Sequence, residues 1–241
     1  MMDRSAEIRV NYLKVLERVD LAAQRSGRDA KGIRLVVVTK GHSPDSINAV
    51  IEAGSKHLGE NYVEEALPKI KGCTNFEHIV WHMVGHVQSR KARQVCESFE
   101  WLHSLDSMRL ASRLNGFSQE IGRRMNILLE CNVSAETTKF GFPAWEEKRW
   151  PELADQLLEL ESYHGLHICG LMTMAPFSND PESSRPYYKR LTRLQKYLGD
   201  HIKSINWCEL SMGMSADFEV AIQEGATLVR IGEAIMGKRP G

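Results

Sequence analysis

A lysine closes the first apolar run of the sequence, where it is either a solvated charge or a reactive amine. The run RLVVVTKGHSPDSI covers residues 34–47, and after Lys40 it changes from apolar residues to a turn that contains glycine, serine and proline. A lysine at a strand end is most often solvated. An amine held at the mouth of a pocket is instead partly desolvated, which lowers its pKa and increases its nucleophilic fraction. The rest of the chain has to decide between these two interpretations.

Two segments near the C-terminal end carry groups that suit an anion. SMGMSADFEVAI starts at Ser211 and contains a flexible glycine, and Ser215 is placed to cap the helix that follows. VRIGEAIMG places Arg230 next to the backbone amides of Gly232 and Glu233. Free N–H groups at a helix start bind anions such as phosphate. Taken alone, each segment is more simply an ordinary turn that contains glycine.

The elements that must position these residues alternate along the chain as short apolar runs and longer segments of helical periodicity. Eight runs predict strands, at residues 35–39, 57–59, 79–84, 101–105, 127–133, 166–172, 208–211 and 227–231. An amphipathic N-terminal helix is indicated by Ile8, Tyr12, Leu16 and Val19. This pattern predicts an α/β fold, a (β/α)8 barrel of the TIM type with an added N-terminal helix. A doubly wound open sheet is the alternative, but no G-x-G-x-x-G motif follows the first predicted strand.

Two stretches read alike as helix, glycine stop, short strand and Gly-Glu. They are NAVIEAGSKHLGE and EVAIQEGATLVRIGE, with Gly54 and Gly225 at the positions where a helix C-terminal cap is expected. Such repeated units fit a barrel. Because no low-complexity linker interrupts the pattern, we expect residues 1–241 to form one domain.

In a barrel of this type the functional face is the C-terminal end of the strands, and phosphate commonly lies after the seventh and eighth strands. Lys40 would share that face with the segments that begin at Ser211 and Arg230. A partly neutral lysine that faces a phosphate site suits a Schiff base with a phosphorylated sugar or with an aldehyde-bearing phosphorylated cofactor. Pyridoxal phosphate is the obvious candidate.

The sequence as a whole resembles the pyridoxal phosphate homeostasis protein family. The motifs follow in order through nearly the whole chain: LVVVTK, LGENYVEEALPK, WHMVGHVQSRK, LHSLD, ECNVSAETTKFGF, GLMTM, ELSMGMSADFEVAI and VRIGEAIMG. The resemblance implies a barrel related to the N-terminal domain of alanine racemases, with pyridoxal 5'-phosphate on Lys40. It also implies the cofactor neighbours, with Ser211, Gly232 and Glu233 at the phosphate, Arg230 at the pyridine nitrogen, and Asn61 and Met212 nearby.

Two positions depart from the family pattern. The position of Glu233 is usually a threonine in this family, so a hydroxyl contact is lost there. A carboxylate that pointed at phosphate would repel it, and we therefore expect Glu233 to turn outward. The residues after Lys40 also differ, because GHS replaces the commoner version with a polar residue and a lysine.

Three functions compete, and Arg230 bears on the choice. A guanidinium facing the pyridine nitrogen keeps the ring unprotonated and weakens it as an electron sink. We rank first a binding protein that holds the cofactor on Lys40 and stores, buffers or delivers it in intracellular vitamin B6 homeostasis, without robust catalysis. A racemase-like enzyme ranks second, since the sequence ends at Gly241 and we expect no second racemase domain. A lyase that acts on a phosphorylated sugar ranks third.

Composition limits the setting and the partners of the protein. Lysine plus arginine and aspartate plus glutamate both number 31, so no electrostatic case for nucleic acid arises. The five cysteines are scattered, which favours a reduced cytoplasmic chain. The N-terminus lacks an apolar signal core, and no segment suits a membrane span. We expect a cytoplasmic monomer whose partners are the cofactor and apo-enzymes that depend on it.

His82 and His86 have the four-residue spacing of metal ligands on a helix, but they straddle a strand end and a turn. Core or rim histidines are the better interpretation. Lys139 and Phe140 are expected to border the opening of the site.

Overall fold

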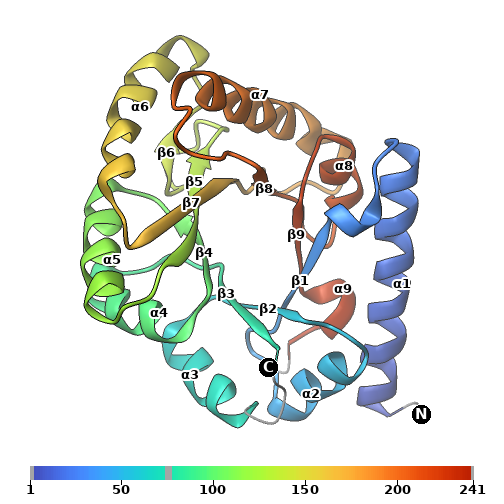
Figure 1. The fold of residues 1–241 in the computed structure, drawn as a ribbon. Coiled ribbons are helices and arrows are strands. Elements are labelled where there is room, and N and C mark those ends of the chain that lie inside the picture. The colour runs from blue at the N-terminus through green and yellow to red at the C-terminus, as the bar shows by residue number, and fades with distance from the viewer. Residues whose placement is uncertain (1–2, 74–77, 240–241) are drawn as a thin grey trace.

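The computed structural model describes residues 3–73 and 78–239 of the chain, and the strands form a closed parallel barrel (Figure 1). Eight strands make the ring, in the order β4-β3-β2-β1-β9-β8-β7-β5, and pairing of β4 with β5 closes it. Their bounds are β1 (Arg34–Val38), β2 (His57–Glu60), β3 (Val80–Met83), β4 (Trp101–Leu105), β5 (Met125–Asn132), β7 (Leu166–Met172), β8 (Glu209–Ser211) and β9 (Leu228–Ile231). Closure confirms the predicted barrel and rules out the open sheet.

Each of the eight predicted strands is present, and no end differs from its predicted position by more than two residues. A ninth strand, β6 (Phe142–Pro143), pairs with β5 alone and was not predicted. Its two residues form too short a run to show a period, and only the tertiary position of the loop brings them to β5.

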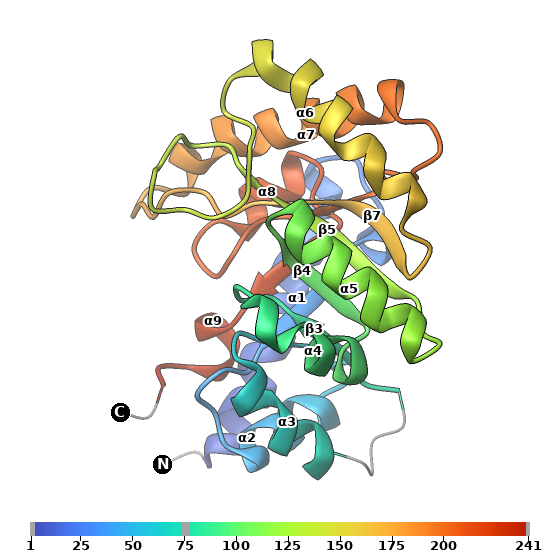
Figure 2. The ribbon, with the colours of Figure 1, turned by 90° about the vertical axis from the view of Figure 1, so that its left-hand side faces the viewer.

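Helices surround the barrel on the outside, as Figures 1 and 2 show. They are α1 (Arg4–Arg25), α2 (Pro44–Glu52), α3 (Val63–Gly72), α4 (Ala92–Ser98), α5 (Met108–Glu120), α6 (Trp150–Leu157), α7 (Arg185–His201), α8 (Phe218–Gln223) and α9 (Glu233–Met236). Short 3-10 helices are η1 (Ala30–Gly32), η2 (Ser89–Lys91), η3 (Glu147–Arg149), η4 (Leu158–Ser162) and η5 (Pro181–Ser184). None of the helices described here is both long enough and apolar enough to cross a bilayer.

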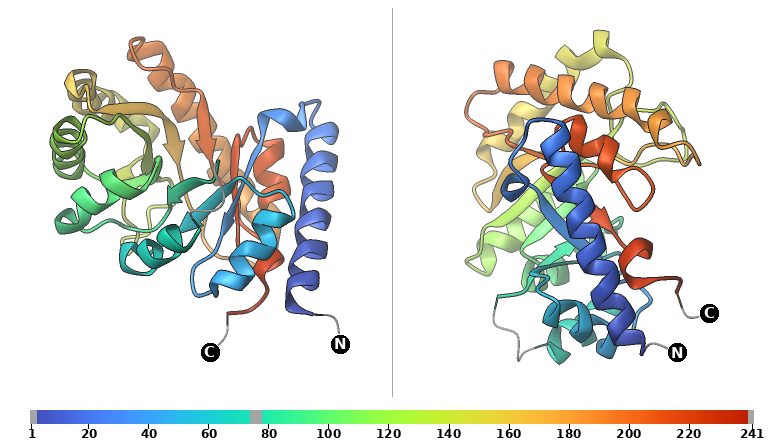
Figure 3. Two further views of the ribbon diagram at one scale, coloured as in Figure 1. Left: turned by 60° about the horizontal axis from the view of Figure 1, so that its bottom comes forward. Right: turned by 90° about the vertical axis from the view of Figure 1, so that its right-hand side faces the viewer.

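The added N-terminal helix α1 is present as predicted and packs against α2, α8 and α9 (Figure 3). Ile8, Tyr12, Val15 and Val19 are buried on one face of it. Full burial of an aliphatic side chain contributes about 1.5–3 kcal/mol. This apolar stripe therefore suffices to hold the helix across the outside of the barrel.

Two apolar layers and a polar centre make up the interior. The larger layer lies between strands and helices, whereas a smaller cluster is formed by Val36, Val84, Trp101, Leu128, Cys169, Met172 and Leu228. The buried polar side chains include His82, His103, Ser211 and Arg230. Buried polar groups are costly unless they are hydrogen-bonded, so their partners bear on function.

The glycine stops of the two similar segments are confirmed. Gly54 has φ +107° and Gly225 has φ +106°, and both end a helix that precedes a strand. Only glycine adopts this conformation without a steric penalty, so both helices end where the sequence predicts.

Candidate functional site

Most of the predicted site residues gather at the C-terminal ends of neighbouring strands. Lys40 follows β1, Asn61 follows β2, and Ser211 ends β8. Arg230 lies in β9, and Gly232 comes directly after it. Because β1 pairs with both β2 and β9 in parallel, and β8 pairs with β9 in parallel, these residues share one end of the barrel.

The Lys40 side chain is half-buried, and its environment favours the neutral amine. Desolvation lowers its pKa, and the positive charge of Arg239 lowers it further, while Glu65 and Glu60 act in the opposite direction. Part of the pKa shift therefore depends on the C-terminal segment, where the Arg239 side chain packs against Gly41.

A buried lysine on α3 anchors the chain just before Lys40. Lys69 Nζ donates to the carbonyl of Thr39 at 2.9 Å and to Glu60 Oε1 at 2.8 Å. It also contacts Glu65 Oε1 at 2.6 Å, and the same oxygen accepts from the backbone N–H of Gly41. Burial raises the pKa of the Glu60 carboxyl, and Lys69 opposes that effect. The network holds both residues that flank Lys40.

Arg230 is almost fully buried, and its guanidinium donates to neutral partners. It reaches Ser211 Oγ at 2.6 Å and the carbonyl of Thr173 at 2.9 Å. Within residues 3–73 and 78–239 the Arg230 guanidinium forms no ion pair. Burial lowers its pKa, but an arginine stays protonated. Its positive charge is therefore available to a ligand in the barrel mouth.

The segment after β9 provides backbone N–H groups beside a serine hydroxyl. Gly232 precedes α9, and a Cβ added there would lie 3.3 Å from the carbonyl oxygen of Val38. The side chain of Glu233 is exposed, in line with the outward orientation predicted for it. Ser215 does not cap α8; its Oγ accepts from the N–H of Ala234 at 3.2 Å instead. Ser215 therefore brings a hydroxyl to the start of α9.

Ser211 and Met212 point to opposite sides of the strand layer, as neighbours in a strand do. Ser211 faces the interior, where it contacts Arg230 and lies 2.8 Å from His103 Nδ1. Met212 is fully buried in the layer between strands and helices. A contact of Met212 with a ligand at the mouth would thus come from its backbone.

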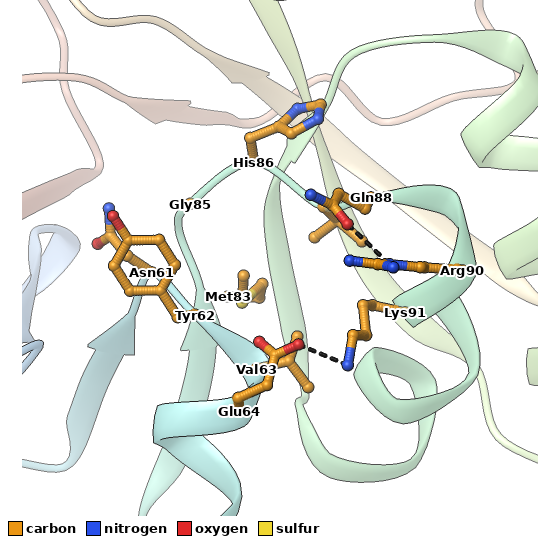
Figure 4. A pocket seen from close by; sticks show the side chains of 11 residues that line it. Asn61, Tyr62, Val63, Glu64, Met83, Gly85, His86, Gln88, Arg90 and Lys91 are labelled. Atoms are coloured by element: carbon orange, nitrogen blue, oxygen red, sulfur yellow. Dashed lines mark hydrogen bonds and ion pairs between the residues drawn. The ribbon is translucent and has the colours of Figure 1, made fainter.

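Asn61 lies beside a cavity of about 320 Å³ at the ends of β2 and β3 (Figure 4). Its Oδ1 atom is buried and has no hydrogen-bond partner among the described residues. Gly85 permits the close approach of the next loop, because a Cβ there would lie 2.3 Å from the carbonyl oxygen of Asn61. In Figure 4, Asn61 and Tyr62 lie across the cavity from Arg90 and Lys91.

Aromatic and charged groups line the rim of the same end. His86 stacks on Phe140 with ring centroids 4.0 Å apart and lies 2.9 Å from Asp106 Oδ2. Lys139 Nζ donates to the carbonyl of Met174 at 3.1 Å. His86 is a rim residue and His82 a core residue, as expected, and both ring nitrogens of His82 contact other histidines.

Sequence reasoning missed Glu130, His103 and Lys69. Glu130 is buried on β5, and desolvation together with Asp106 raises its pKa to about 7, while Arg230 opposes the rise. The one local sign of these residues in the sequence was a polar or charged side chain at a position expected to be buried. Glu130 and His103 lie inside apolar strands, and Lys69 lies on the buried face of a helix. Which of them meet in space depends on closure of the barrel.

Comparisons with known proteins agree with this arrangement. Residues 10–240 match the family model described as alanine racemase, N-terminal domain. The chain is 36% identical to the pyridoxal phosphate homeostasis protein of Escherichia coli K12 over 239 residues, which cover 97% of both chains. The protein of that name from Synechocystis is 36% identical over 207 residues, or 86% of this chain and 92% of its own.

Solved structures show the same fold. PipY of Synechococcus elongatus, described with pyridoxal phosphate bound, has a TM-score of 0.79 and 32% identity, and the match covers 92% of this chain and all of PipY. Alanine racemase of Streptomyces coelicolor shares the fold at 16% identity, with a TM-score of 0.71 over 96% of this chain and 58% of the racemase. The chain thus carries an alanine racemase N-terminal domain and belongs to the pyridoxal phosphate homeostasis protein family.

Proposed function

We propose that this protein binds pyridoxal 5'-phosphate as a Schiff base on Lys40 and takes part in intracellular homeostasis of the cofactor. The observation that carries this proposal is the half-buried, pKa-lowered amine of Lys40 on the barrel end that also holds Arg230 and Gly232. Relatives at 36% identity are named pyridoxal phosphate homeostasis proteins, and the structure of PipY is described with pyridoxal phosphate bound.

The residues present fit the three chemical parts of the cofactor, which supplies an aldehyde, a phosphate and a pyridine ring. The Lys40 amine condenses with the aldehyde and releases water. The backbone N–H groups of Gly232 and Glu233, with the Ser215 hydroxyl, suit the phosphate. Asn61 has an unpaired buried oxygen at the edge of the site.

Arg230 is proposed to face the pyridine nitrogen, and Ser211 supports it there. The resemblance placed Ser211 at the phosphate; we now assign it to the ring end, because its hydroxyl contacts the guanidinium. A guanidinium donates and cannot accept a proton from the ring, so the nitrogen stays unprotonated. This weakens the electron sink that amino-acid chemistry needs, which favours a holder of the cofactor over an enzyme.

Storage, buffering or delivery of the cofactor follows from a reversible linkage. We propose that the protein acts in the cytoplasm as a monomer and that apo-enzymes which need pyridoxal phosphate receive it. Arg239, which lowers the pKa of Lys40, favours formation of the linkage, because the neutral amine is the nucleophile that attacks the aldehyde. Reversal takes up one water and returns the free amine and the aldehyde.

The test is to load the purified protein with pyridoxal phosphate, record its absorption spectrum, reduce it with borohydride and map the added mass. We expect a visible band that is lost on reduction and an adduct on Lys40. Lys40→Ala should lose the adduct and keep a native circular dichroism spectrum, while Lys56→Ala, at the opposite end of the barrel, should keep it. Absence of an adduct in the parent protein would contradict the proposed role of Lys40.

A racemase-like enzyme is the alternative, and the shared racemase fold favours it. Incubation of the loaded protein with L-alanine in heavy water separates the two functions. A carrier leaves the α-hydrogen in place, whereas a racemase exchanges it and produces D-alanine with turnover above that of free cofactor.

A further inference from the structure

A chain of hydrogen-bonded side chains runs through the barrel interior and ends at Arg230. His57 Nδ1 lies 3.0 Å from His82 Nε2, and His82 Nδ1 lies 2.9 Å from His103 Nε2. His103 Nδ1 lies 2.8 Å from Ser211 Oγ, which accepts from Arg230 at 2.6 Å. The five residues come from five different strands, so the contacts exist only in the closed barrel.

The two central histidines are neutral. His82 and His103 are fully buried, and desolvation lowers the pKa of both far below the usual value for histidine. Nearby positive charge adds to the effect, from Arg230 at His103 and from Arg34 at both rings. The indole of Trp101 stacks on His82 with centroids 5.7 Å apart and holds the ring plane. Each ring therefore carries one N–H donor and one acceptor nitrogen.

The hydroxyl of Ser211 determines which way the donors point. Arg230 is a permanent donor, so it uses a lone pair of Ser211 Oγ. Among the residues that the structure describes, His103 Nδ1 is the acceptor within reach of the Ser211 proton. If His103 donated instead, a buried hydroxyl proton would lose its partner, which is costly. Ser211 therefore donates to His103 Nδ1, and the His103 proton must reside on Nε2.

The same reasoning extends to the outer end of the chain. His103 Nε2–H donates to His82 Nδ1, so the His82 proton resides on Nε2 and is donated to His57 Nδ1. Neutral His57 then presents its own Nε2–H outward. His57 is half-buried at the start of β2, and burial, Arg34 and Lys56 all lower its pKa, which keeps it an acceptor toward His82.

We propose that His57, His82 and His103 are positioning residues. By accepting the proton of the Ser211 hydroxyl they turn a lone pair of Ser211 Oγ toward Arg230, and this holds the guanidinium in place for a ring nitrogen. The part of this proposal that concerns the ring rests on the proposed function, whereas the direction of the chain does not. Three histidines whose protons all lie on Nε2 would thus connect the cofactor end of the barrel to its opposite end.

The first test uses the cofactor-free protein. Two-bond proton–nitrogen correlation spectra of protein labelled with ¹⁵N-histidine distinguish Nδ1–H, Nε2–H and doubly protonated rings, and His57→Gln assigns one signal. We expect Nε2–H for all three rings at neutral pH. His201, whose Nδ1 contacts the carbonyl of Tyr197 at 2.7 Å, should be Nδ1–H and is an internal reference. An Nδ1–H or doubly protonated His82 or His103 would overturn the proposal.

The second test removes the outer acceptor, far from the cofactor end. In His57→Leu we expect both tautomers at His82 and His103, a changed absorption band of the loaded protein and cofactor binding weaker by about fivefold, the value of one buried hydrogen bond. His57→Gln, which still offers an acceptor, should restore parent behaviour, and His167→Leu, an exposed histidine on β7, should have no effect. Unchanged tautomers and binding in His57→Leu would remove His57 from any positioning role. Failure of the parent protein to bind cofactor would contradict the proposed function and leave the tautomer result standing.

Discussion

Lys69 donates a hydrogen bond to the carbonyl of Thr39, the residue directly before Lys40, at 2.9 Å. Its ammonium also pairs with the fully buried carboxylate of Glu60 at 2.8 Å. The backbone directly before the reactive lysine is thus held by a second lysine, whose ammonium has three acceptors, the Thr39 carbonyl and the carboxylates of Glu60 and Glu65. The hydrogen bond from Lys69 thus connects helix α3 to the end of strand β1, directly before Lys40, and fixes the backbone that positions Lys40.

We predict that Lys69→Met lowers the free energy of unfolding by about 3–5 kcal/mol, because it leaves a buried carboxylate unpaired. The double variant Lys69→Met/Glu60→Gln should recover at least half of this loss, since it removes the uncompensated charge. Urea unfolding curves of the three proteins provide the comparison. A loss below about 1 kcal/mol in the single variant would mean that the pair contributes little.

Stability should depend on pH through Glu130, whose pKa is raised to about 7. The folded state binds this proton more tightly than the unfolded state, so the raised pKa costs stability as pH rises from about 4.5 through about 7. We expect Glu130→Gln to be more stable than the parent at pH 8, by up to about 3 kcal/mol at 1.36 kcal/mol per pKa unit. Thermal unfolding at pH 8 and pH 5 measures this, and an equal difference at both values would refute the assignment.

Gly85 and Gly116 form a matched pair of tests for the close approach beside Asn61. A Cβ at position 85 would lie 2.3 Å from the carbonyl oxygen of Asn61, whereas one at position 116 in α5 meets no atom within 4 Å. We predict that Gly85→Ala destabilises the protein by about 1–3 kcal/mol and weakens cofactor binding. Gly116→Ala should stabilise it by about 0.5–1 kcal/mol. Equal effects in unfolding experiments would argue against a backbone contact at Gly85.

Arg230→Gln should change the absorption band of the loaded protein, because a neutral amide no longer prevents protonation of a facing ring nitrogen. Glutamine can still bond to Ser211, so the fold is expected to persist. Arg18→Gln is the control, since Arg18 pairs with Glu219 on the outer surface. A band identical to that of the parent protein would remove Arg230 from the ring.

Local patterns in the chain were enough to predict the barrel strands, the N-terminal helix and the caps at Gly54 and Gly225. They succeeded because an apolar run, a helical stripe and a glycine stop each act over a few neighbouring residues. The same local patterns also predicted that Lys40 lies at the end of a strand. A Schiff-base role for Lys40 and an anion site at Gly232 were predicted from the same patterns, whereas the role of Arg230 at the pyridine nitrogen came from motifs that resemble a family.

Tertiary structure decided which polar residues meet. His57, His82, His103 and Ser211 are separated by up to 108 residues from one contact to the next, and no local pattern links them. Neither Lys69 nor Arg239 was predicted to contribute to the site. Ring closure brings such groups together in a low-dielectric interior, where contact distances rather than sequence spacing determine protonation, and the chemistry of the site follows from that.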